Sequence, residues 1–216
     1  LLRTWSMLAL ALALAGCMSP QTYTSARPVP DGKVVGSVAY DPVAIYTGEA
    51  REGTLRRLPA NAYPLIGSMH FRFGTGRSCD FGLHFILSPG VDVKCALVQT
   101  ERFAFAVMPR VDVAMQKGGA AVISGVGLAS FEVTDWFRIS PNLGPTGMLG
   151  DMRLTWPYGQ GDSGNLAGIY MRSGLGFELH YDWFSFMPEV TYMVELRNAP
   201  LQAIFGGVAF GFGTIP

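Results

Sequence analysis

The chain has 216 residues, of which 49% are hydrophobic and only 15% are charged. This composition excludes a disordered chain, which would be polar and rich in charge. Sixteen basic and sixteen acidic residues give a formal net charge of zero, so the sequence carries no electrostatic footprint for nucleic acid. The length suits one domain of ordinary size, and three cysteines are too few for a disulfide scaffold.

The first residues have the pattern of a secretion signal. Arg3 precedes an apolar run of leucine and alanine from 7 to 15, which is far shorter than the roughly 20 residues of a transmembrane helix. The run ends in Leu14-Ala15-Gly16-Cys17, a tetrad that resembles the lipobox of bacterial lipoproteins. The resemblance implies a signal peptide over 1–16, cleavage before Cys17 and a Cys17 thiol that carries a diacylglyceryl group. The alternative is an apolar run followed by an ordinary buried cysteine.

Two features follow the cysteine. Met18 occupies the position where an Asp is the usual inner-membrane retention signal in enteric bacteria, so the sequence favours the outer membrane. Residues 17–33 include Pro20, Pro28 and Pro30, and proline at this density extends or punctuates a chain. We therefore expect 17–33 to be a flexible tether and 34–216 to form the folded domain.

Alternation of apolar and polar residues with a period of two dominates the rest of the chain, and it predicts strands. A first strand near 34–46 is weakened by Pro42. From 140 to 164, prolines and glycines indicate a loop, with a possible strand at 148–156. The expected count is eight to ten strands. The remaining alternating runs, in chain order, cover 69–73, 81–87, 91–98, 102–113, 169–183, 189–196 and 201–212.

Short turns such as Thr75-Gly76-Arg77 and Ser88-Pro89-Gly90 separate successive runs. Links this short force antiparallel neighbours, because parallel pairs need a crossover of a dozen or more residues. A turn centred on Pro89 places Leu83 opposite Cys95 and Cys79 opposite Gln99. At about 3.3 Å per residue the two cysteines are then on the order of 13 Å apart, so this register predicts two free thiols.

The two faces of the strands indicate a membrane barrel. The polar face mixes charges with small residues such as Gly82 and Ala104, which suits the crowded interior of a narrow barrel. The other face is rich in Phe, Leu and Val, with Tyr181 and Trp183 near a strand end, as at a membrane interface. We predict an all-β, antiparallel up-and-down β-barrel of about 8–10 strands, membrane-embedded. A soluble lipocalin-like barrel or sandwich with an apolar interior is the alternative.

With this pattern, residues 65–213 resemble small bacterial outer-membrane β-barrel proteins. The stretch 186–190 and the Gly- and Phe-rich strand after it resemble the closing hairpin of such barrels. Many of them end in Phe, whereas this chain ends Gly213-Thr214-Ile215-Pro216, so either Phe212 serves the same purpose or insertion differs. The resemblance implies an outer-membrane location, lipid around the barrel and the outer-membrane insertion machinery as a partner.

Charges of both signs lie on the predicted inner face. Unpaired charges in a confined space are costly, so we expect a structural network of ion pairs, with a polar conduit or ligand site as the alternative. The residues expected to face the lumen are His70, Arg72, His84, Asp92, Lys94, Arg110, Asp112, Arg172, Glu178, His180 and Asp182.

No pattern indicates catalysis. Gly161-Asp162-Ser163-Gly164 resembles the nucleophile loop of serine proteases, but the three histidines lie in strand runs and lack the flanking residues of that family. We expect no cofactor, no metal and no enzyme activity. The sequence predicts a lipoprotein barrel with a structural or small-solute, porin-like role. The alternatives are a lipid-tethered carrier of an apolar ligand and a lipid-modifying enzyme.

The lipobox yields the first prediction. Replacing Cys17 with Ala removes the thiol that accepts lipid, so lipid addition is expected to stop and the signal to remain uncleaved or be cleaved elsewhere. Metabolic labelling with a radioactive fatty acid measures this. Label that persists on the Cys17→Ala protein would show that the anchor is not at this residue.

Overall fold

The computed structural model describes residues 21–50, 53–55, 68–76, 78–85, 89–114, 120–150, 167–196 and 202–213. Within them the regular elements are all strands, as predicted. None of the described residues forms a helix long and apolar enough to cross a membrane. The strands are β1 (Val34–Ala50), β2 (Gly53–Leu55), β3 (Ser68–Gly74), β4 (Cys79–Phe85), β5 (Gly90–Gln99), β6 (Phe103–Ala114), β7 (Ala120–Thr134), β8 (Phe137–Gly150), β9 (Gly168–Tyr181), β10 (Phe184–Glu195) and β11 (Gln202–Gly213).

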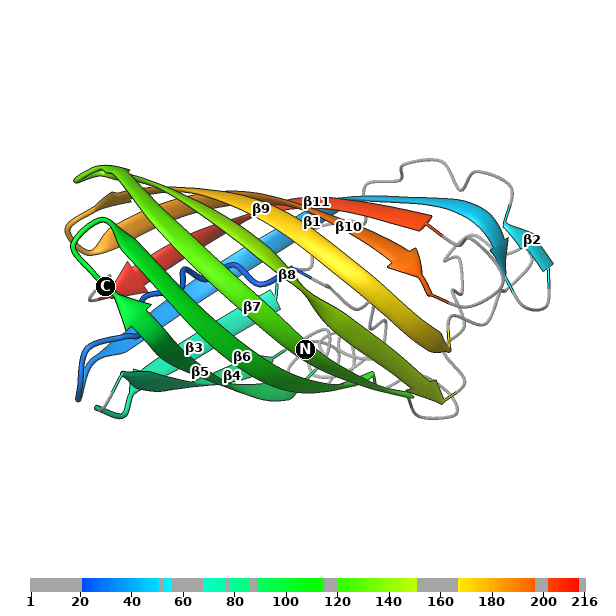
Figure 1. Cartoon of the computed structure of the whole chain (residues 1–216), viewed down its shortest axis with the longest axis horizontal. Helices are drawn as coiled ribbons and strands as arrows, with labels where there is room; N and C mark the ends of the chain where they lie inside the picture. Colours follow the sequence, from blue (N-terminus) through cyan, green and yellow to red (C-terminus); the bar gives the residue numbers. More distant parts are fainter. Residues whose placement is uncertain are drawn as a thin grey trace, which may run out of the picture.

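Ten of these strands form a closed antiparallel barrel (Figure 1). Strands β3 to β11 each pair with the next along the chain, and β1 pairs with both β3 and β11, which closes the sheet. The short β2 pairs only with the far end of β1. The predicted up-and-down meander is therefore confirmed, and β1 closes the ten-stranded sheet by pairing with both of its ends.

The barrel is apolar outside and polar inside. Along β9, Leu175 and Leu179 point outward with 39% and 41% of their surface exposed, whereas Glu178 between them is buried. Trp136, Tyr181 and Trp183 are exposed at the end of the barrel where the short turns lie. This is the pattern of a membrane-spanning barrel with an aromatic girdle. A lipocalin-like carrier needs an apolar interior, so that alternative is wrong for the central lumen.

Prolines did not end strands where the sequence suggested. Residues 140–150, expected to be mostly loop, belong to β8, and its pairing with β7 is interrupted beside Pro141 and Pro145. Proline has no N–H for the ladder, so the strand continues with local gaps. Pro42 similarly lies at an irregularity of β1 between Tyr40 and Val43. The sequence pattern did not reveal strand β7, because its inward positions hold both apolar and polar residues.

The prediction of two free thiols was wrong. Cys79 and Cys95 are directly opposite each other and form a disulfide, with their Cα atoms 4.1 Å apart. The hairpin turns earlier than expected, so that Leu83 pairs with Val91 and His84 with Gly90. The error is four residues along the partner strand. An even shift leaves every side chain on its predicted face, so the assignment of inner and outer residues does not change.

Two motifs lie outside the described residues. One is the N-terminal signal with Cys17, and the other is Gly161-Asp162-Ser163-Gly164. Residues 151–156 of the possible strand at 148–156 also lie outside them, and residues 148–150 belong to β8.

The outward apolar face yields the second prediction. Leu179→Asp places a charge on the lipid-facing surface, where a charge costs about 0–1 kcal/mol near the interfaces and more toward the bilayer midplane. We expect this variant to assemble poorly and to lose heat-modifiable mobility in gel electrophoresis. The control is Leu179→Phe, which stays apolar and should assemble normally. Normal assembly of Leu179→Asp would mean that this face does not contact lipid.

Candidate functional site: a charged lumen occupied by the N-terminal segment

The inner wall carries as many buried cations as buried carboxylates. Among the described residues, five Lys and Arg side chains and five Asp and Glu side chains are buried. Equal numbers let each charge find a partner, which a confined site of low dielectric constant requires. The cations are Arg72, Lys94, Arg110, Arg138 and Arg172, and the carboxylates are Asp80, Asp92, Asp112, Glu178 and Glu189.

Arg72 is the centre of the first network. Its guanidinium donates to the carboxylates of Asp80 and Asp92, with 2.7 Å between Nη2 and Asp92 Oδ1. Lys94 Nζ lies 3.2 Å from the other oxygen of Asp80. Neighbouring strands provide these groups, so the network ties β3, β4 and β5 together from inside the barrel.

His84 continues this network to β6. Its Nε2 lies 2.5 Å from Asp92 and its Nδ1 lies 3.1 Å from Asp112. Asp112 in turn accepts a hydrogen bond of 2.6 Å from Arg110. The ring of His70 lies beside that of His84, with 4.7 Å between their centroids. The pairs across strands that the sequence predicted are thus present in one continuous chain of contacts.

Arg138 forms a second network near the short-turn end. Its guanidinium donates to Glu132 at 2.6 Å and to Glu178 at 2.8 Å. Glu132 also accepts from Arg27, at 2.7 Å, and Arg27 belongs to the segment before the barrel. This network therefore joins β7, β8 and β9 to the N-terminal segment.

The segment before β1 does not leave the barrel. Backbone hydrogen bonds join Gly32 and Lys33 to Gly74 at the short-turn end, where β1 begins and β11 finishes. From there the chain runs back into the lumen, to Gln21 about halfway along β10 and β6, beside Glu189 and Arg110. Figure 1 shows the start of this path in dark blue. We name residues 21–30 the lumenal segment.

Residues 21–33 were expected to be part of a flexible tether, and this prediction was wrong. Eight of the ten residues in 21–30 are buried, and Gln21 and Ala26 have no exposed surface. The composition of a solvated linker and that of a segment bound in a polar lumen are the same, because both need small polar residues and extended backbone. Contacts with the barrel wall therefore determine whether such a segment is solvated or bound.

Carboxylates of the wall bind main-chain N–H groups of the lumenal segment. Glu189 accepts hydrogen bonds from the amides of Thr22, at 3.0 Å, and Tyr23, at 2.7 Å. Asp80 accepts from the amide of Val29 at 2.8 Å. These are charge-assisted hydrogen bonds, which are about twice as strong as those between neutral groups.

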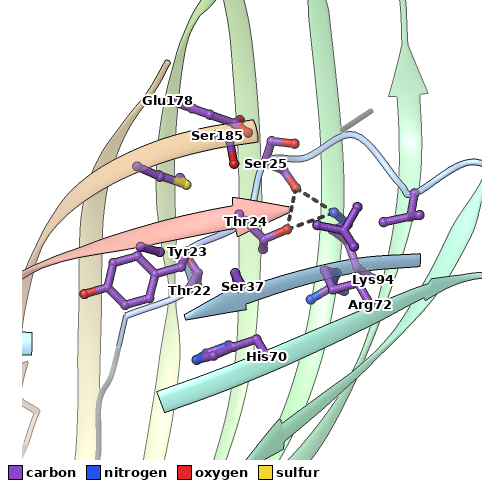
Figure 2. A pocket seen from close by; sticks show the side chains of 15 residues that line it. Thr22, Tyr23, Thr24, Ser25, Ser37, His70, Arg72, Lys94, Glu178 and Ser185 are labelled. Carbon is purple, nitrogen blue, oxygen red and sulfur yellow. Dashed lines mark hydrogen bonds between the residues drawn. The ribbon is translucent and has the colours of Figure 1, made fainter. Parts of the chain in front are cut away.

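Cations of the wall bind main-chain carbonyl groups of the same segment. Lys94 Nζ donates to the carbonyl oxygens of Ser25 at 2.8 Å and of Arg27 at 2.7 Å. Arg110 donates to that of Gln21 at 2.9 Å. Lys94 also donates to Thr24 Oγ1, and Figure 2 shows this amine reaching both Thr24 and Ser25. The wall therefore provides acceptors for main-chain N–H groups of the lumenal segment and donors for its main-chain carbonyl groups.

A small apolar patch completes the fit. Ala26 packs against Ala104 and Ala106 of β6 and Val126 and Leu128 of β7, all buried, while its amide donates to Ser130 at 2.7 Å. Burial on both sides leaves room for only a small side chain at Ala26.

Tyr23 marks a bend in the lumenal segment. Its φ of 43° lies in the left-handed region that favours glycine. The hydroxyl contacts Gln21 and Asp41, and the ring meets His70 edge-on, with 6.3 Å between centroids. A bend here turns the segment so that Gln21 and Thr22 reach Glu189.

A cavity of about 50 Å³ remains between the lumenal segment and the wall. Residues 22–25 line one side, and wall groups including His70, Arg72 and Lys94 line the other, as Figure 2 shows. This volume suits a few water molecules with polar partners and is too small for an apolar carrier's ligand. No group of three or more His, Cys, Asp or Glu among the described residues is arranged to hold a metal ion.

The structure places most of the predicted lumen residues inside the barrel. His180 is half-buried on the inner side, with Nδ1 unpaired. Asp182 is the exception: it is exposed in the turn between β9 and β10, with a φ of 48°, because the alternation ends at Tyr181. Nine of the eleven are buried, namely His70, Arg72, His84, Asp92, Lys94, Arg110, Asp112, Arg172 and Glu178.

Sequence reasoning missed two kinds of residue. Asn142 was overlooked because the prolines of β8 predicted a loop from residue 140 onward, and Arg138 was overlooked because it lay in no predicted strand. The lumenal segment was missed because many of its contacts run through main-chain groups, which leave no signature in the sequence, and because the wall partners of its side chains, such as Glu132 for Arg27, lie far along the chain. Asp80 and Glu189 alternate correctly for the inner face but gave no sign of a bound chain.

The contacts of Glu189 yield the third prediction. Glu189→Gln weakens the acceptor of two segment amides, so the segment should leave the lumen more often. A cysteine introduced as Ser25→Cys, in a Cys17→Ala background, reports this by its maleimide labelling rate in the folded barrel. We expect labelling at least about tenfold faster with Glu189→Gln, because a hydrogen bond to a charged group contributes about 1.5–3 kcal/mol.

The matched control for that experiment is Leu175→Val, a small change on the outer face that should leave the rate unaltered. Equal labelling rates in the Glu189→Gln and parent proteins would mean that the carboxylate does not hold the segment.

No protein-family model matches the sequence, and no curated protein does so. Among solved structures, the fold is similar to an outer membrane channel from Pseudomonas putida F1, with a TM-score of 0.52 and 8% identity over 91% of this chain and 100% of that one. Ail, the attachment invasion locus protein of Yersinia pestis, gives a TM-score of 0.36 and 10% identity over 84% and 99%, too loose for any argument. At such identities the likeness concerns the fold alone, and that fold is the closed antiparallel β-barrel of outer-membrane proteins.

Proposed function

We propose that this protein is a small-solute channel of the bacterial outer membrane, anchored through an acylated Cys17 and closed by its own lumenal segment. The observation that carries the proposal is the content of the lumen. In a barrel with a purely structural role, wall side chains alone fill the interior. Here residues 21–30 lie inside the wall from the short-turn end to about halfway along β10, and they bind wall side chains of β4, β7 and β10.

The outer surface supports the membrane location. The outward side chains of β9, such as Leu175 and Phe177, are exposed and apolar, and aromatic residues lie at the short-turn end. Such a surface would drive aggregation in water. Insertion of so apolar a barrel requires an outer-membrane insertion machinery, which we take to be a partner.

The charge balance of the wall bears on the solute. Five buried cations face five buried carboxylates, so the passage has no large field of one sign to favour anions or cations. A small polar solute without a strong net charge is therefore the class that this lumen suits. The histidines point into the lumen and away from lipid, which disfavours a lipid-modifying enzyme.

The proposed anchor is close to the closing element. Cys17 precedes Gln21 by four residues, and an extended chain spans at most about 3.6 Å per residue. The Cα atoms of the two residues are thus never more than about 14 Å apart. A change in the position of the lipid anchor would act directly on the buried end of the lumenal segment.

Conductance through planar bilayers tests the proposed channel. The test variant is the full chain with Tyr23→Pro and Ala26→Pro, which lacks two bound N–H groups and forbids the positive φ at position 23. The wall is unchanged. We expect the wild-type protein to be closed for most of the recording and the variant to conduct.

The matched control carries Tyr23→Phe and Ala26→Gly, which keep both N–H groups, and should behave like the wild type. The proposal fails if the proline variant assembles, exposes Ser25→Cys to maleimide and yet conducts no more than the wild type. That result would indicate a structural role for the barrel.

A further inference from the structure

We propose that the lumen is a binding site for the main chain of an extended peptide, and that the lumenal segment is its intramolecular occupant. Peptides supplied from outside would then be ligands of the same site. This inference deepens the proposed function by naming a class of solute, and it depends on that function only in requiring that the lumen be accessible.

The hydrogen bonds of the lumenal segment are the first support. Four amides, those of Thr22, Tyr23, Ala26 and Val29, and three carbonyls, those of Gln21, Ser25 and Arg27, bind wall side chains. Every one of these seven groups is present in any peptide without proline at the donor positions. The wall therefore recognises the feature that all peptides share.

The sign of the wall charges follows the polarity of the chain. Glu189 and Asp80 face amides, and Lys94 and Arg110 face carbonyls. Each of these side chains also has a partner in the wall: Asp80 pairs with Arg72, and Arg110 with Asp112. The wall charges are thus held in place and are not left unpaired when a peptide departs.

Side chains of the segment add specificity at its charged and hydroxyl positions, since Arg27 pairs with Glu132 at 2.7 Å and Thr22 Oγ1 donates to Glu189 at 3.0 Å. Ala26, Pro28 and Val29 have no side-chain atoms that form hydrogen bonds, and the Ala26 methyl packs against Ala104 and Ala106. That contact sets one size limit, a small residue at the equivalent position. The ligand class is accordingly an extended peptide with a small residue at the position of Ala26 and a cation at the position of Arg27.

Covalent attachment explains why the segment occupies the site at rest. A tethered occupant acts at an effective concentration in the millimolar range. A free peptide competes only when the tethered segment is weakened or when the peptide is abundant. The closed state and the peptide site are then two aspects of one equilibrium.

Peptide binding to the Tyr23→Pro/Ala26→Pro protein tests the proposal. The probe is a fluorescent synthetic peptide with the sequence of residues 20–31, followed by anisotropy with the full chain in detergent micelles. The decisive control peptide has the same side chains but N-methyl groups at the amides matching Thr22, Tyr23, Ala26 and Val29. A scrambled peptide keeps the alanine in place and changes the order of the other residues outside the proline positions.

We expect the probe to bind the variant more tightly than the wild type, since the tethered segment competes less. The N-methylated peptide should bind at least about tenfold more weakly, because it lacks hydrogen bonds to charged groups. The scrambled peptide, which moves the arginine and the hydroxyl residues, should bind more weakly than the probe but more tightly than the N-methylated peptide, because it keeps the main-chain contacts. Lys94→Met, a substitution in the wall, should also weaken binding of the probe peptide.

Equal binding of the N-methylated and unmodified peptides would overturn the proposal, as would no binding to a variant that conducts. The second result would leave the channel intact and remove only the peptide site. Peptide binding by a variant that never conducts would support the peptide site and contradict the proposed channel.

Discussion

Charge compensation inside a narrow barrel is the constraint on which the rest of the structure depends. The apolar outer face commits the polar residues to the lumen, where an ion without a partner would be costly. Arg72 meets this requirement by binding Asp80 and Asp92, and His84 passes the contact on to Asp112. Strand pairing alone would close the barrel, and the networks then bind adjacent strands from within.

The same constraint explains how a proline-containing segment comes to lie in the lumen. Wall ion pairs leave further hydrogen-bonding capacity on Glu189, Lys94 and Asp80, and a chain without regular structure has free amides and carbonyls to meet it. The wall and the lumenal segment thus satisfy each other's buried hydrogen-bonding groups. The closed lumen, the proposed gating and the proposed peptide site all follow from this exchange of hydrogen bonds.

Much of the fold could be predicted from the sequence, because alternation with a period of two survives errors in register. The hairpin around Pro89 was misplaced by four residues, which hid the disulfide between Cys79 and Cys95 yet left both faces correct. The prolines of β8 were misleading because a strand that pairs with neighbours on both sides tolerates local gaps in its pairing. The lumenal segment could not be predicted, since its main-chain and side-chain contacts both depend on wall residues that only the closed barrel brings together.

A cross-link between the segment and the wall tests the central claim most directly. The Ala26 amide donates a hydrogen bond of 2.7 Å to Ser130 Oγ, so Ala26→Cys together with Ser130→Cys, in a Cys17→Ala background, places the two cysteines at contacting positions of the segment and the wall. Oxidation of the folded, membrane-inserted protein should give a disulfide-linked peptide pair in mass spectrometry. If both thiols instead remained free and reacted rapidly with maleimide in the assembled barrel, the segment would not occupy the lumen.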